Sequence, residues 1–252
     1  MSDPARVGAT PTPATTPLLG AVHNLATFHR DHERFYATAP REQAVTIQRH
    51  ARTLQSLADR WATVEPSTRV AQSPFEGAED LNAPAALQLD GVLFLEGGGE
   101  PDELRRLRRD LRTMAEDHLE TGAWLASAMD VSWDVTSQLV PLDELADVLG
   151  ERHRIIANDW QAAALSTLAG RVVQRAVDVL DVVDLEPAAL RRPGALGVAA
   201  RRLWSAAELL DHAADLLSDS AGLVHDNERR WRTVRDRVDE VVAAAHEGST
   251  ER

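Results

Sequence analysis

Residues 196–245 read LGVAARRLWSAAELLDHAADLLSDSAGLVHDNERRWRTVRDRVDEVVAAA, and this stretch decides the fold. Its apolar residues return every seven positions, at Leu196, Leu203, Leu210, Leu217, Val224, Trp231, Val238 and Ala245. A seven-residue repeat without proline is typical of a long helix that packs along other helices. We therefore expect one long helix here, with Gly222 as the position at which it could fold back into a hairpin.

Four further stretches carry helical periodicity. Residues 17–39 and 41–65 flank Pro40 and predict an antiparallel helical hairpin. Residues 101–140 and 142–184 predict two more long helices, the second with a possible kink at Gly150. Such helices would be about 60–75 Å long. The sequence thus predicts an all-α fold, an elongated bundle of about five long helices with coiled-coil-like packing, and residues 17–246 as one domain.

The remaining segments break this periodicity. Residues 1–16 are rich in Pro, Thr and Ala and are expected to form a disordered tail. Residues 247–252 are expected to form a short tail after the last helix. Residues 66–100 contain several Pro and Gly and predict an irregular crossover between the helical hairpin and the long helices of 101–246. Within the crossover, Asp90-Gly91 is a turn signal for a short β-hairpin. An alternative is that the apolar residues of 84–95 insert into a membrane.

Composition removes several classes of chemistry. All 27 cationic side chains of the 252-residue chain are arginine, and the chain has no cysteine. Lysine-dependent phosphate loops and Schiff bases, thiol nucleophiles and Cys-metal sites are therefore excluded. No catalytic residue and no cofactor is predicted. The net charge of −13 argues against general nucleic-acid binding. No signal peptide and no membrane span are visible in the sequence, so a cytoplasmic location is expected.

Three histidines fall on the apolar stripes of their predicted helices: His29, His32 and His118. Inward side chains on facing helices are the way in which bundles build metal or ligand sites. The favoured interpretation is a buried polar layer that fixes helix register. Neither Glu-x-x-His nor His-Glu-x-x-His occurs in the chain, which argues against di-iron and zincin chemistry. No metal site is predicted.

Five arginines crowd the start of the 101–140 helix: Arg105, Arg106, Arg108, Arg109 and Arg112. Guanidinium groups pair bidentately with carboxylates and phosphates, so this face is a candidate surface for an acidic partner. The alternative is a solvated face balanced by Asp102, Glu103 and Asp110. If the face binds a partner, replacing Arg105, Arg108 and Arg112 by glutamate should leave the fold intact.

Residues 142–160, LDELADVLGERHRIIANDW, resemble a helix-turn-helix motif over this short range only. Gly150 would be the turn glycine, and Arg152, His153, Arg154 and Asn158 could contact DNA. Glu151 and Asp159 stand where the motif usually has apolar residues. A kinked bundle helix is the favoured interpretation.

The sequence therefore leads to one functional hypothesis and two main alternatives. The leading hypothesis is a non-enzymatic helical bundle that binds protein partners or a second copy of itself. The first alternative is a small-ligand or metal-binding bundle that uses the histidine layer. The second is a DNA-binding regulator that uses residues 142–160, although no nucleic-acid partner is expected.

Overall fold

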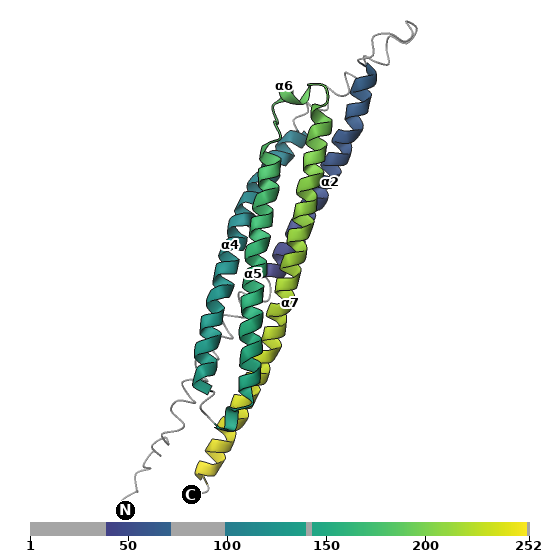
Figure 1. The fold of residues 1–252 in the computed structure, drawn as a ribbon. Coiled ribbons are helices and arrows are strands. Elements are labelled where there is room, and N and C mark those ends of the chain that lie inside the picture. The colour runs from purple at the N-terminus through teal and green to yellow at the C-terminus, as the bar shows by residue number, and fades with distance from the viewer. Residues whose placement is uncertain (1–38, 72–98, 140–142, 251–252) are drawn as a thin grey trace, which may run out of the picture. The chain divides into compact units, whose positions relative to one another are not determined.

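The chain is all-α in its computed structural model, which describes residues 39–71, 99–139 and 143–250 (Figure 1). The elements are α2 (Ala39–Ala71), α4 (Gly99–Leu139), the short 3-10 helix η1 (Asp143–Leu145), α5 (Val148–Asp181), α6 (Pro187–Leu190) and α7 (Ala195–Thr250). The described ranges contain no strand, and no helix in them is long and apolar enough to cross a membrane. The predicted all-α bundle is confirmed.

The seven-residue stripe lies on a single helix. Helix α7 continues from Ala195 to Thr250 through Gly222, so the alternative of a hairpin is not adopted. Every stripe position from Leu196 to Val238 is buried. The connection before α7 needs Gly194, which has φ = 82°, because residues with a Cβ rarely adopt this backbone conformation.

Three predicted boundaries were wrong. Residues 247–252 were expected to form a tail, but α7 continues to Thr250. Helix α2 continues through Pro66 to Ala71, although the sequence analysis ended it at Pro66. A proline removes one backbone hydrogen bond of the helix but does not forbid its continuation. Helix α5 begins at Val148 rather than at residue 142, so Gly150 lies in its first turn. The predicted helix 17–39 falls almost wholly, and the predicted β-hairpin entirely, outside the described residues.

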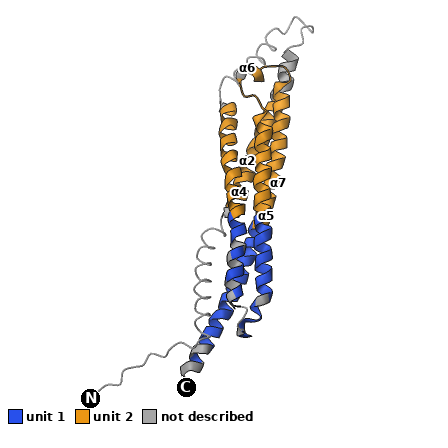
Figure 2. Cartoon of the chain, turned by 60° about the vertical axis from the view of Figure 1, so that its left-hand side comes forward, with its two compact units in different colours: residues 1–39, 124–163, 221–252 blue, residues 40–123, 164–220 orange. Residues whose placement is uncertain are grey.

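The chain divides into two compact units (Figure 2). Unit 1 comprises residues 1–39, 124–163 and 221–252, and unit 2 comprises residues 40–123 and 164–220. Helices α4, α5 and α7 each contribute residues to both units. The two units have separate apolar clusters and are described one at a time below.

Unit 2 is a bundle of α2 with parts of α4, α5 and α7, and α6 lies within the connection from α5 to α7 (Figures 1 and 2). Consecutive helices run antiparallel. Trp61 of α2 donates to Glu100 of α4 at 2.8 Å, and Gln43 donates to Thr121 at 3.4 Å. The core is rich in alanine and leucine. Alanine allows helix axes to approach closely, which increases dispersion contacts along the bundle.

Unit 1 has a core with a large aromatic centre. Trp231 of α7 is fully buried with Leu145 of η1 and with Val148 and Ile155 of α5. A second cluster joins Leu125 of α4 to neighbouring residues of α5 and α7. Burial of a tryptophan side chain stabilises by several kcal/mol, roughly 3–5 when judged by truncation to alanine.

Candidate functional site

His118 is the member of the predicted histidine layer that the structure describes. It lies on α4 in unit 2 and is fully buried, as the sequence predicts. Neither ring nitrogen has a hydrogen-bond partner among the described residues. Burial lowers the pKa of His118 to about 4 because the charged imidazolium would lose its hydration. The ring is therefore neutral at pH 7.

The surroundings of His118 are tightly packed. A Cβ atom placed on Gly170 of α5 would lie 3.2 Å from the Cβ of His118 and 3.1 Å from the Cγ of Leu119. Glycine thus allows α5 to pack directly against this part of α4. His29 and His32 lie outside the described residues. Within the described ranges, no group of three or more His, Asp or Glu side chains could hold a metal ion.

The predicted arginine face of α4 is partly used inside unit 2. Arg108 donates to the carbonyl oxygen of Leu180 and, at 2.7 Å, to that of Val183. Arg105 donates to the carbonyl oxygen of Leu185 at 3.1 Å. These acceptors belong to the last turn of α5 and the residues just after it, where backbone carbonyl groups lack partners within the helix. Burial is the largest cause that lowers the pKa of Arg108 below its ordinary value.

Arg112 completes this contact with α5. It donates to both carboxylate oxygens of Asp181, at 2.7 and 2.8 Å, and the bidentate hydrogen bond raises the pKa of Arg112. The expectation that Arg105, Arg108 and Arg112 could be replaced without effect on the fold therefore conflicts with the structure. These three arginines hold the end of α5 to α4. The sequence could not show it because the acceptors are about 70–80 positions away.

Arg106 and Arg109 differ from the other members of the arginine face. Both side chains are exposed on α4, and no ion pair involves either of them among the described residues. They lie three positions apart, which places them on one side of the helix. An acidic partner at these two arginines stays a prediction.

The helix-turn-helix interpretation of residues 142–160 does not fit the structure. Only the three-residue η1 precedes α5, so the first of the two required helices is missing from the described residues there. The predicted DNA contacts are also engaged inside unit 1. Arg152 is buried with its guanidinium carbon 3.7 Å from the centre of the Trp133 ring. Asn158 donates to Asp226 at 3.1 Å, and Arg154 donates to Glu151 at 3.2 Å.

A buried polar pair that the sequence analysis missed joins α5 to α7 in unit 1. Asn227 and Asp159 are both fully buried. The amide nitrogen of Asn227 donates to Asp159 at 2.7 Å and to the carbonyl oxygen of Ile155 at 2.9 Å. A polar pair of this kind fixes the register of two helices, because any slip would separate the partners. The sequence carried one signal for this pair: Asp159 stands at a position where an apolar residue was expected.

The arginine-rich stretch 229–237 also pairs within unit 1. Arg230 donates to Glu151 and to Asp226, each at 2.8 Å, and Arg229 donates to Asp226 at 2.7 Å. Desolvation alone would raise the pKa of Asp226, but hydrogen bonds from Arg230, Arg229 and Asn158 together lower it. The stretch therefore supports the packing of α7 on α5.

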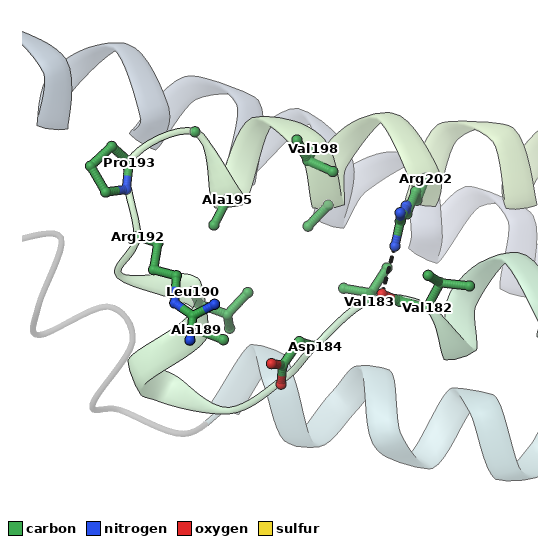
Figure 3. Close-up of a pocket in the computed structure, with 12 residues that line it drawn as sticks. Val182, Val183, Asp184, Ala189, Leu190, Arg192, Pro193, Ala195, Val198 and Arg202 are labelled. Carbon is green, nitrogen blue, oxygen red and sulfur yellow. Dashed lines mark hydrogen bonds between the residues drawn. The ribbon is translucent and has the colours of Figure 1, made fainter.

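A cavity of about 380 Å³ opens in unit 2 between the end of α5, α6 and the first turns of α7 (Figure 3). Its apolar wall includes Val183, Leu190 and Ala199, all of them buried. Val182 and Val198 also line the cavity, yet their side chains are 62% and 43% exposed. The cavity thus has an apolar interior and an apolar rim that faces solvent.

Three charged side chains line the same cavity: Asp184, Arg192 and Arg202 (Figure 3). Arg202 donates to the carbonyl oxygen of Val182 at 2.5 Å, and Asp184 accepts a hydrogen bond from the amide of Glu186 at 3.0 Å. Neither Arg192 nor Arg202 forms an ion pair with an acidic side chain of the described ranges. Both cations are therefore available to an anionic group that enters from outside.

Unit 1 presents a large apolar side chain at its surface. Trp160 of α5 is 62% exposed. Ala157 and Ile156, one turn before it, share its side of the helix, and neither carries charge. No hydrogen bond to the Trp160 indole occurs among the described residues. The exposed tryptophans Trp204 and Trp133 contact other side chains. Trp204 donates to Asp59 at 3.1 Å, and the guanidinium of Arg152 lies over the Trp133 ring.

Comparison of the chain with protein-family models, with curated proteins and with solved structures finds no match.

Proposed function

We propose that this protein is a non-enzymatic helical bundle that acts by binding another protein or a second copy of itself. The observation that carries the proposal is Trp160, an exposed tryptophan on an uncharged side of α5 in unit 1. Tryptophan is enriched at the energetic centres of protein interfaces, because burial of its large rigid side chain by a partner is strongly favourable. A cytoplasmic location belongs to the same proposal and rests on the sequence.

Site-specific photocrosslinking in the source cells tests this proposal. A benzoylphenylalanine at Ala157, one turn from Trp160, should crosslink to a defined protein or to a second copy of the chain. The matched control carries the same group at Thr233, an exposed position of α7 in unit 1. The crosslinked protein is then identified, purified and titrated with the wild-type chain.

The affinity of that purified pair supplies the decisive measurement. Trp160→Ala should weaken binding by about 2 kcal/mol, or roughly thirtyfold in Kd, because truncation of a hot-spot tryptophan typically has an effect of this size. Val45→Ala, which truncates another exposed apolar side chain on α2, should leave the Kd unchanged. Equal crosslinking from both positions, or an unchanged Kd for Trp160→Ala, would contradict the proposal.

A further inference from the structure

Three charged side chains line the cavity beside α6: Arg192, Arg202 and Asp184. The chain carries 40 acidic and 27 basic side chains, and many of its arginines pair with neighbouring carboxylates, for example Arg112 with Asp181. Arg192 and Arg202, by contrast, line the cavity without a carboxylate partner in the described ranges. Arg201, exposed one turn after Val198, adds a further cation near the rim. The two lining arginines outnumber the single lining carboxylate, Asp184, which favours a negatively charged occupant.

The apolar residues indicate what else the occupant carries. Val183 and Leu190 supply buried walls, so an aliphatic or aromatic side chain that enters the cavity would be removed from water. The exposed Val182 and Val198 face solvent at the opening. A molecule confined to the interior would leave these two side chains uncovered. An extended chain that crosses the opening would cover them.

We propose that this cavity binds an acidic peptide segment of a partner protein. One large apolar side chain of the segment enters between Val183 and Leu190, and carboxylates beside it pair with Arg192 and Arg202. Guanidinium groups bind carboxylates through paired hydrogen bonds, which sets the position of the segment as well as its charge. This inference rests on the proposed function and adds the chemical class of the partner.

A blocked peptide of sequence Glu-Glu-Ile-Phe-Glu-Glu is the probe. Its binding to the full chain is followed by fluorescence anisotropy, and its position by NMR of methyl-labelled valine and leucine. The methyl resonances of Val182, Val198 and Leu190 should shift. The matched peptides Gln-Gln-Ile-Phe-Gln-Gln and Glu-Glu-Gly-Gly-Glu-Glu lack either the charge or the apolar pair. Each should bind at least roughly tenfold more weakly.

Variants of the arginines complete the test. Arg192→Glu should weaken binding of the acidic peptide by roughly tenfold or more and should leave the fold intact, because Arg192 is exposed. Arg202→Gln should weaken binding less and is the second variant, since Arg202 also bonds to Val182. The control is Arg49→Glu with Arg52→Glu at two exposed positions of α2, which should bind as wild type.

Three outcomes would overturn the inference: no peptide binding at millimolar concentration, binding that Arg192→Glu does not weaken, or methyl shifts away from the cavity. Octanoate is tested alongside, and equal or tighter binding of octanoate would assign the cavity to a small carboxylate instead. These results are independent of Trp160. A partner that depends on Trp160 while no peptide binds the cavity would leave the proposed function standing and remove only this inference.

Discussion

Unit 1 and unit 2 hold the same long helices together by different means. Unit 2 relies on small aliphatic residues, with alanine at many buried positions of α5 and α7. Its buried His118 is neutral and makes no side-chain hydrogen bond to any residue that the structure describes. Unit 1 relies on Trp231 and on the buried pair of Asp159 and Asn227. The buried hydrogen bond between α5 and α7 joins two serine hydroxyls, Ser166 and Ser220, in unit 2, whereas in unit 1 it joins the Asn227 amide to a carboxylate.

The largest effect is expected from truncation of the central tryptophans. Trp231→Ala in unit 1 and Trp61→Ala in unit 2 should each lower the free energy of unfolding by about 3–5 kcal/mol, because each leaves a large cavity. Hydrogen exchange read by mass spectrometry should show faster exchange mainly in the unit that carries the substitution. Equal acceleration in both units for either variant would mean that the two cores unfold as one.

The second effect is a pH dependence that originates in unit 2. The pKa of His118 falls from 6.5 to about 4 on folding, so the unfolded chain takes up a proton first as the pH falls between these values. Stability is therefore complete above pH 6.5 and should decrease by as much as roughly 3 kcal/mol by pH 4. His118→Leu should remove most of this decrease and preserve or raise stability at pH 7.

Urea unfolding at several pH values measures this effect. His212→Gln, a change at an exposed histidine of unit 2, is the control and should keep the wild-type slope. A smaller slope should persist in His118→Leu, because burial also lowers the pKa of His50. If His118→Leu and wild type lose stability in parallel below pH 6.5, His118 is not the buried neutral group described above.

The third effect concerns the hydrogen bonds that distinguish unit 1. Asn227→Leu removes the donor to the buried carboxylate of Asp159 and should lower the free energy of unfolding by about 2 kcal/mol. The matched change in unit 2 is Ser166→Ala with Ser220→Ala, which removes both members of a buried hydroxyl pair 3.0 Å apart. Removal of both partners should be nearly neutral. Chemical denaturation measures the free energy of unfolding of both variants. Equal decreases for the two changes would contradict this difference between the units.

The smallest effect is expected at the end of α5. Arg108→Ala removes the donor to the carbonyl groups of Leu180 and Val183 and should cost about 1–2 kcal/mol. Arg109→Ala, at the neighbouring exposed position, should change stability by less than about 0.5 kcal/mol. Thermal unfolding of the two variants gives the comparison. If both variants have a similar melting temperature, the hydrogen bonds of Arg108 do not stabilise the fold. Arg108 would then lie on a solvated face, which is the alternative that the sequence left open.

Periodicity made the helices predictable. The stripe from Leu196 to Val238 predicted both a continuous α7 and the burial of each stripe residue, because an apolar face of a helix must be removed from water. The same reasoning predicted buried His118. It was wrong at Pro66, since a proline weakens a helix without always ending it, and at the start of α5, which is Val148 rather than residue 142.

The sequence by itself determined the all-α class, the long helices and the faces that they bury, because these depend on residues three, four and seven positions apart. The tertiary structure alone decided that Arg108 bonds to the end of α5, that Asn227 meets Asp159, and that Arg192 and Arg202 line one cavity. Those contacts join residues of different elements. Helix pairing and register bring them together, and no local spacing in the chain encodes that choice.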